Sequence, residues 1–427
     1  MRSPISSRTS LEQMSYTLGF SDSVTVEPIV KPAASPPGKR FDIQGLRGVG
    51  VLLVVVGHLW RWPPGAFVAL DLFFVLSGFL ITGVLLDVSA KFGRIYFIPF
   101  FLSRVRRLMP TALVVIVATV ASFYWLFSAA RGELVLRDGI YAAVFAANWH
   151  FSSQGTDYFS DHTQSPLLHY WSLSVEEQFY AVWPLLLFGI LIVARRVRRP
   201  VVLLAAGMAT VTVVAFGYSL WHSATNLDAA YFSTFDRVWE FGAGALLCLA
   251  RDKAAALPFW VARASSWLGG AVLLVAVATM HEGMAFPAPW GLLPVLATLA
   301  IGFGGMGNHT SHMRYFANRP LVYVGDISYS LYLWHLPINL ALKAFFTVES
   351  TAYYVWALAL TAVFSVASYH LLEHPLRYAP WLMAAPERER AVAREFERSQ
   401  QVRRVRQGWT AISGVAVIVG LVLVLQP

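Results

Sequence analysis

The chain has 427 residues, of which 57% are hydrophobic and only 13% are charged. A soluble domain has roughly 45–50% apolar and about 25% charged residues, so this composition excludes an ordinary soluble domain and predicts a polytopic protein in the lipid bilayer. The single cysteine, Cys248, excludes an intrachain disulfide framework and a cysteine cluster for a metal. The net charge of +9 would suit nucleic acid, but most arginines stand in short connections between apolar runs, as in membrane proteins, and we expect no nucleic-acid partner.

Residues 1–39 are polar, rich in Ser, Thr and Pro, and end in "KPAASPPGKR". No apolar stretch precedes a cleavage site, so this segment is not a signal peptide. We predict a disordered cytoplasmic tail.

Eleven apolar runs follow, each near the roughly 17–25 residues that cross a bilayer as a helix. They lie near 45–61, 66–88, 108–128, 177–195, 200–221, 237–251, 265–281, 287–306, 326–346, 351–372 and 409–426. The sequence therefore predicts an all-α, polytopic transmembrane helix bundle, with a ten-helix body over 40–380 and an eleventh helix over 409–427. The charged stretch 381–408 is expected to form a cytoplasmic linker helix before this last span.

Lysine and arginine predict the orientation of these spans. Alternate connections are rich in both residues, including those at 91–107, 195–199, 251–263 and 377–406, while the opposite connections are poorer. The richer side is cytoplasmic, so we expect the N-terminus inside and the C-terminus outside the inner (plasma) membrane. The stretch 134–151, "LVLRDGIYAAVFAANWHF", would reverse this pattern if it crossed, so we expect a non-spanning or re-entrant segment that needs protein or water around it.

Two titratable residues stand out in the first apolar run. Arg47 and His58 are eleven residues apart, which on a helix is three turns plus about 20°, with a rise of roughly 16 Å. They should share one helix face, with Arg47 at the cytoplasmic mouth and His58 towards the outer half. Ionisable residues inside a membrane are functional candidates; the alternatives are snorkelling for Arg47 and a hydrogen-bonded core histidine for His58.

The second run, "ALDLFFVLSGFLITG", begins after a short turn and should pack antiparallel to the first. Asp71 would then lie close to His58, where a carboxylate could orient the imidazole and stabilise its cation. The alternative is a helix cap at the outer end. Ser77 and Gly78 are small, and we expect them to allow close helix packing.

In "FLSRVRRLMP", Arg104 and Arg107 are three residues apart and project from one helix face. They stand level with Arg47 at the cytoplasmic mouth. Three guanidiniums there would suit phosphates, which arginine binds in bidentate fashion. The alternative is ordinary positive-inside charge.

In "SPLLHYWSLSVEEQFYAVWP", Glu176 and Glu177 are expected at the outer mouth of the fourth run. Glu176 could bind an acceptor hydroxyl or support the histidine, while "SVEE" could also be a plain N-terminal cap. Lesser candidates are Asp236, Arg237 and Glu240. For His335 a structural role is favoured.

In order along the chain, six stretches resemble the acyltransferase-3 family of integral membrane acyltransferases, over about Phe41 to Arg377. They are "DIQGLRG…H", "DLFFVLSGFLITG", "RVRRLMP", "SPLLHYWSLSVEEQFY", "GDISYSLYLWH" and "LLEHP". The resemblance implies about ten helices, an acyl-CoA donor taken from the cytoplasm and an envelope glycan or glycolipid as extracytoplasmic acceptor. The family's Arg-x10-His pattern falls on Arg47 and His58, and its Arg-x-x-Arg pattern on Arg104 and Arg107.

This resemblance agrees with the physical interpretation of the residues. Coenzyme A phosphates held by the arginines would lay the thioester arm along the helix face towards His58. With an ordinary pKa near 6.5, His58 could take the proton of a sugar hydroxyl as it attacks the thioester; an acyl-histidine intermediate is the less favoured route. We therefore assign acyl-CoA binding to Arg47, Arg104 and Arg107 and expect no metal. Acetyl is the default acyl group, with succinyl as the alternative. We assign catalysis to His58, Asp71 and Glu176.

Two rival functions follow from the same residues. A transporter or flippase for an envelope glycoconjugate could line its pathway with these charges, and a non-catalytic scaffold would not need Arg47 and His58 on one face. Family members with an eleventh helix often carry a further extracytoplasmic domain after it, and we expect such a domain to be missing from this chain, which stops at Pro427.

Overall fold

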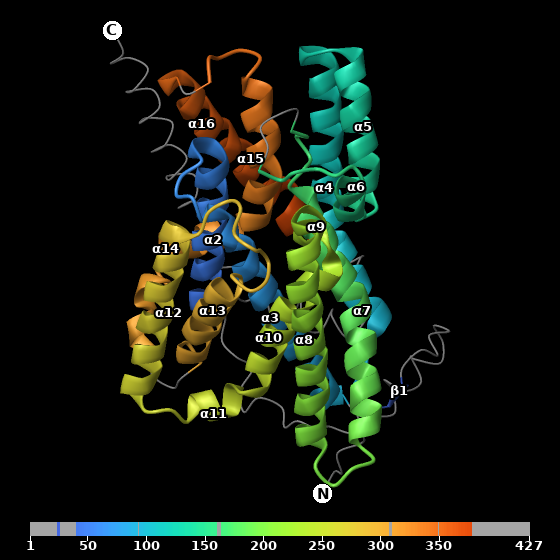
Figure 1. Ribbon diagram of the computed structural model, residues 1–427, viewed down its shortest axis with the longest axis vertical. Helices are drawn as coiled ribbons and strands as arrows, with labels where there is room; N and C mark the ends of the chain where they lie inside the picture. The colour runs from blue at the N-terminus through green and yellow to red at the C-terminus, as the bar shows by residue number, and fades with distance from the viewer. Residues whose placement is uncertain are drawn as a thin grey trace, which may run out of the picture.

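Apolar runs fold into helices throughout the computed structural model, which describes residues 24–25, 40–92, 94–159, 164–306, 310–348 and 350–377. The described part is a bundle of α-helices (Figure 1), so the all-α prediction is confirmed. Most of the tail 1–39, the linker 381–408 and the eleventh helix 409–427 lie outside the described residues. Within that tail, β1 (Val24–Thr25) pairs antiparallel with β2 (Arg94–Ile95), with Val24 opposite Ile95.

Each of the ten runs expected in the body corresponds to a helix. These helices are α2 (Phe41–Trp60), α3 (Ala69–Phe92), α4 (Phe97–Leu126), α7 (Tyr170–Ala194), α8 (Pro200–Thr225), α10 (Thr234–Leu249), α12 (Phe259–Thr279), α13 (Leu292–Gly304), α15 (Ser328–Leu342) and α16 (Thr351–Ser368).

Seven helical segments of the described chain are long and apolar enough to cross a membrane. They contain α2, α3, α4, α7, α8, α12 and α16. The other three helices are shorter than the roughly 17–25 residues that cross a bilayer, at 16 residues for α10, 13 for α13 and 15 for α15. For α13 the cause is visible in "FPAPWG", because prolines lack the N–H that a helix interior needs.

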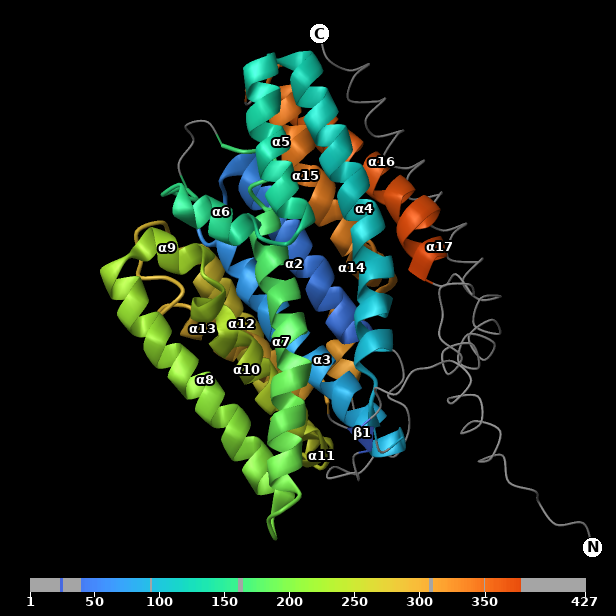
Figure 2. The ribbon, with the colours of Figure 1, turned by 90° about the vertical axis from the view of Figure 1, so that its right-hand side faces the viewer.

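Short elements connect these helices. They are η1 (Ala66–Val68), α5 (Ala129–Ala143), α6 (Ala147–Ser153), α9 (Leu227–Phe232), α11 (Arg251–Ala255), η2 (Ser311–Tyr315), α14 (Arg319–Asp326), the π-helical η3 (Tyr369–Glu373) and α17 (His374–Arg377). The stretch 134–151, expected not to span, is divided between α5 and α6. Phe145 separates the two helices with a left-handed backbone (φ 53°), and α5 packs along α4 (Figures 1 and 2).

The core lies where α2, α3, α7 and α10 meet, with α8 on the outside (Figure 2). Trp171, Trp183 and Phe74 are fully buried there. At Gly78 in α3, an added Cβ would lie 1.9 Å from the carbonyl oxygen of Phe241 in α10. The two backbones therefore touch, as predicted for this glycine.

Candidate functional site

A cavity of about 60 Å³ lies between α2, α3, α7 and α15. Its lining residues are Arg47, Leu70, Phe73, Phe74, Ser172, Leu173, Glu176, Ser328, Tyr329 and Tyr332. Two residues chosen from the sequence, Arg47 and Glu176, thus face one space. Its other walls are mainly aromatic and aliphatic, which suits a ligand with a polar end and an apolar arm.

Arg47 forms the polar end of this cavity. Its Nη2 donates to Ser328 Oγ at 3.1 Å, and its Nη1 lies 3.5 Å from Gln44 Oε1. Gln44 Nε2 in turn donates to Asp326 Oδ1 at 2.6 Å. The hydrogen bonds of the guanidinium thus go to neutral oxygens, while Glu373 acts on it electrostatically.

Arg104 and Arg107 lie beside Arg47, and a fourth arginine joins them. Arg47, Arg104 and Arg377 all act electrostatically on Arg107. The Arg104 Cζ sits 3.2 Å from the ring centroid of Tyr180. Four guanidiniums from α2, α4 and α17 thus converge. The sequence analysis places Arg377 only among the general cytoplasmic charge.

Carboxylates position these arginines. Glu177 pairs with Arg104 at 3.6 Å, and Glu373 with Arg107 at 4.0 Å. Glu373 also accepts from Ser330 Oγ at 3.2 Å. With Glu176, three carboxylates lie beside the four arginines. Such a cluster can hold phosphate oxygens.

Glu176 lies at the arginine end and not at the outer mouth of its helix. Because α7 begins at Tyr170, Glu176 is six residues into the helix, about 9 Å from its start. It accepts hydrogen bonds from Ser77 Oγ, at 2.5 Å, and from Tyr180 Oη. Glu176 is therefore neither an N-terminal cap nor hydrogen-bonded to His58.

His58 lies at the other end of the same face of α2. Its Nδ1 is 2.9 Å from the carbonyl oxygen of Val54. A carbonyl can only accept, so Nδ1 carries the proton and Nε2 has a free lone pair. Tyr158 Oη donates to that Nε2 at 3.1 Å; burial raises the pKa of this tyrosine, so its phenol remains protonated. The nitrogen that a general base needs thus already contacts a hydroxyl.

The residue predicted to orient His58 is elsewhere. Asp71 Oδ1 pairs with Arg237 Nη1 at 3.3 Å, and the same nitrogen lies 3.1 Å from Glu240 Oε1. All three side chains are fully buried. Asp71 does not orient His58 as expected, because the Val54 carbonyl takes the ring N–H. Asp71, Arg237 and Glu240 instead form a buried ion cluster that ties α3 to α10.

Tyr332 connects the two ends of the site. It lines the cavity that contains Arg47, and its ring centroid is 5.5 Å from that of His335. The His335 ring is in turn 4.9 Å from that of His58. The cavity at Arg47 thus reaches Tyr332, and the rings of Tyr332 and His335 connect it to His58, which does not line it. In the described residues, no group of three or more His, Cys, Asp or Glu side chains is arranged to hold a metal.

Comparison with known proteins identifies the family. The model of the acyltransferase-3 family, described as an acyltransferase domain, matches residues 40–370. The chain is 30% identical over 348 residues to the Bacillus subtilis protein named "Putative peptidoglycan O-acetyltransferase YrhL", covering 78% of this chain and 54% of that protein. It is 29% identical to "O-acetyltransferase OatA" of Staphylococcus aureus, covering 78% and 57%. No solved structure matches. The chain thus spans little more than half the length of these relatives.

Proposed function

Because the chain belongs to the acyltransferase-3 family, we propose that it is a membrane O-acyltransferase that moves an acetyl group from cytoplasmic acetyl-CoA to an envelope-glycan hydroxyl. Peptidoglycan is the acceptor that a relative's name suggests. The observation that carries the proposal is that Arg47 and His58 lie at opposite ends of one face of α2, with Arg104, Arg107 and Arg377 gathered near Arg47 and an unprotonated nitrogen on His58.

In this proposal Arg47, Arg104, Arg107 and Arg377 bind the phosphates of the coenzyme on the cytoplasmic side. Glu177 and Glu373 hold two of these guanidiniums in place. The arm of the coenzyme then follows the cavity as far as Tyr332. Arginine suits this task because its fork of donors matches a phosphate in two hydrogen bonds.

His58 acts as the general base at the far end. Its Nε2 takes the proton from the acceptor hydroxyl while the oxygen bonds to the thioester carbon. The carbon–sulfur bond then breaks, and the imidazolium returns the proton to the leaving thiolate. General acid–base catalysis of this kind contributes roughly 10²–10⁴ in rate. The Val54 carbonyl keeps the ring in the tautomer that exposes Nε2, and Tyr158 marks where the hydroxyl would sit.

The test is release of free thiol from acetyl-CoA by the purified protein in lipid nanodiscs, with and without a soluble peptidoglycan fragment. We expect release that depends on the fragment and falls by about 10²–10⁴ in His58→Ala. The control is His281→Ala, an exposed histidine, which should match the unaltered protein. A transporter would move the glycan without releasing thiol, and that result would reject the proposal.

A further inference from the structure

Three histidines from separate elements lie side by side at the proposed reaction centre. The His335 ring centroid is 4.9 Å from that of His58 and 5.2 Å from that of His169, the residue before α7. His335 and His169 are 3% and 1% exposed. Groups this deeply buried normally have every polar atom hydrogen-bonded.

Both of these histidines have one ring nitrogen bonded and one without a partner. His335 Nδ1 donates to the carbonyl of Tyr332 at 2.6 Å, and His169 Nε2 to that of Leu333 at 3.1 Å. The remaining nitrogens are therefore lone-pair acceptors. No atom of the described residues donates to His335 Nε2 or His169 Nδ1. Burial lowers the pKa of His169 to about 3, so its ring stays neutral.

No described residue supplies the missing donor, which a ligand or solvent can provide. Tyr158 Oη already donates to His58. Since no three-residue metal group is formed in the described chain, hydrogen-bond donors fit these two nitrogens best.

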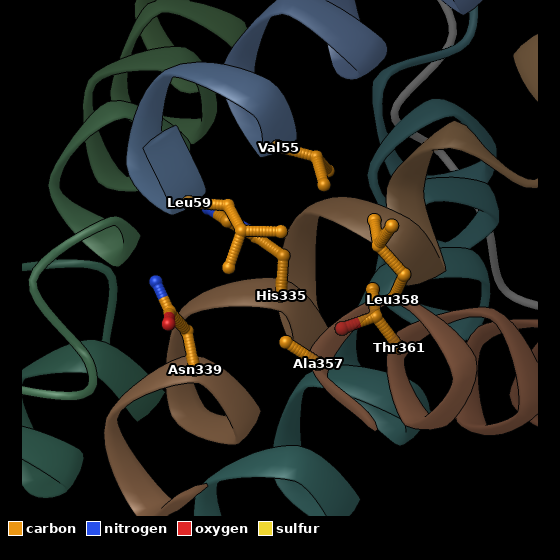
Figure 3. Close-up of a pocket in the computed structure, with 7 residues that line it drawn as sticks. All are labelled: Val55, Leu59, His335, Asn339, Ala357, Leu358 and Thr361. Atoms are coloured by element: carbon orange, nitrogen blue, oxygen red, sulfur yellow. The ribbon is translucent and has the colours of Figure 1, made fainter. Parts of the chain in front are cut away.

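The position of His335 also suits a ligand. On one side it contacts Tyr332, a wall of the cavity that contains Arg47. On the other side it lines a second, smaller pocket of about 10 Å³ between α2, α15 and α16, together with Leu59 and Asn339 (Figure 3). Asn339 Nδ2 donates to the carbonyl of His58 at 3.0 Å. His335 thus stands between the proposed donor cavity and a separate pocket beside the base.

We propose that His335 Nε2 and His169 Nδ1 bind a second donor group of the acceptor, next to the hydroxyl that His58 deprotonates. The attacking hydroxyl has a single proton and gives it to His58, so these two nitrogens need other O–H or N–H groups. The acceptor class is therefore a sugar or other polyol with neighbouring donors, and not a monohydric alcohol. This inference rests on the proposed function and states which class of acceptor the enzyme would select.

A double-mutant cycle between protein and acceptor tests it. The probes are N-acetylglucosamine and its singly deoxygenated analogues, at saturating acetyl-CoA, with His335→Leu, His335→Gln and the control His281→Leu. We expect kcat/KM of the unaltered protein to fall 10- to 100-fold for at least one analogue. A site that hydrogen-bonds a hydroxyl discriminates against a substrate that lacks it. With His335→Leu, kcat/KM for the same analogue should be less than threefold below that for the parent sugar.

His335→Gln keeps an acceptor oxygen and should recover part of the discrimination, while acetyl-CoA affinity should stay unchanged in both variants. Equal discrimination by His335→Leu and the unaltered protein would overturn the inference. Loss of acetyl-CoA affinity would also overturn it, because that outcome shows a structural role. If the unaltered protein acylates no sugar, the proposed function fails. Calorimetric binding of N-acetylglucosamine then decides the inference: weaker binding by His335→Leu supports it, and equal or no binding rejects it.

Discussion

The tautomer of one imidazole determines what the candidate site can do. His58 is oriented by a backbone carbonyl four residues earlier in its own helix, which no side-chain pattern could have indicated. A carboxylate partner would stabilise the imidazolium, whereas a carbonyl fixes the tautomer without adding a negative charge. The base is therefore set up to take a proton and release it again, as a transfer reaction requires.

This arrangement predicts the behaviour of Asp71. Asp71→Asn should lower the melting temperature, because Asp71 is a fully buried partner of Arg237. It should leave the pH at which activity is half-maximal unchanged, because the carboxylate does not contact His58. Activity and thermal unfolding measured over a pH series separate the two roles. A shift of the pH profile by a full unit would restore Asp71 as the orienting group.

The arginine cluster leads to a second prediction about individual residues. Arg104→Ala, Arg107→Ala and Arg377→Ala should each weaken acetyl-CoA binding about tenfold or more, since hydrogen bonds to charged groups contribute roughly 1.5–3 kcal/mol. Lysine at each position should restore only part of the affinity, because it lacks the bidentate fork. Calorimetry measures both effects. Arg137→Ala, at an exposed position in α5, serves as the control, and equal affinities throughout would mean that the arginines serve topology alone.

Helix boundaries explain which residues the sequence could place. The spacing of Arg47 and His58 follows from helix geometry, and the structure keeps both on α2. Glu176 was misplaced because α7 starts seven residues earlier than its apolar run, in the polar and aromatic stretch "YWSLSVE". Arg377 gave no separate signal, because many arginines follow it in the sequence. Contacts between distant elements, such as Asp71 with Arg237, are set by packing and lie beyond a pattern in one segment.

The contact of α3 with α10 allows a direct test of this packing. Gly78→Ala places a methyl group where the Phe241 carbonyl now lies, 1.9 Å from the new Cβ. Forcing the helices apart should cost about 1–3 kcal/mol. Gly189→Ala in α7 is the matched control, because its Cβ would meet nothing within 4 Å. Thermal unfolding in detergent should show a lower melting temperature for the first variant and no loss for the second; equal melting temperatures would contradict the close approach.

At the scale of the whole molecule, the short helices raise the question of how many segments cross. An α10 of 16 residues is about 24 Å long, less than the roughly 30 Å of the hydrocarbon core. It lies between α3 and α8, antiparallel to α8 (Figure 1). A helix covered by neighbouring protein does not have to match the bilayer, because its ends are satisfied by protein and not by lipid. We therefore expect α10 to cross despite its length.

Alkaline phosphatase fusions test this topology, because the enzyme is active only outside the cytoplasm. Lysine and arginine predict that the 195–199 and 251–263 connections are cytoplasmic. If α8 and α10 each cross once, a fusion after Arg199 should be inactive, one after Asn226 active and one after Lys253 inactive. By the same charge rule, a fusion after Arg406 should be inactive and one after Pro427 active. An active fusion after Lys253 would show that α10 does not cross, and an active fusion after Arg199 would overturn the predicted orientation of α7.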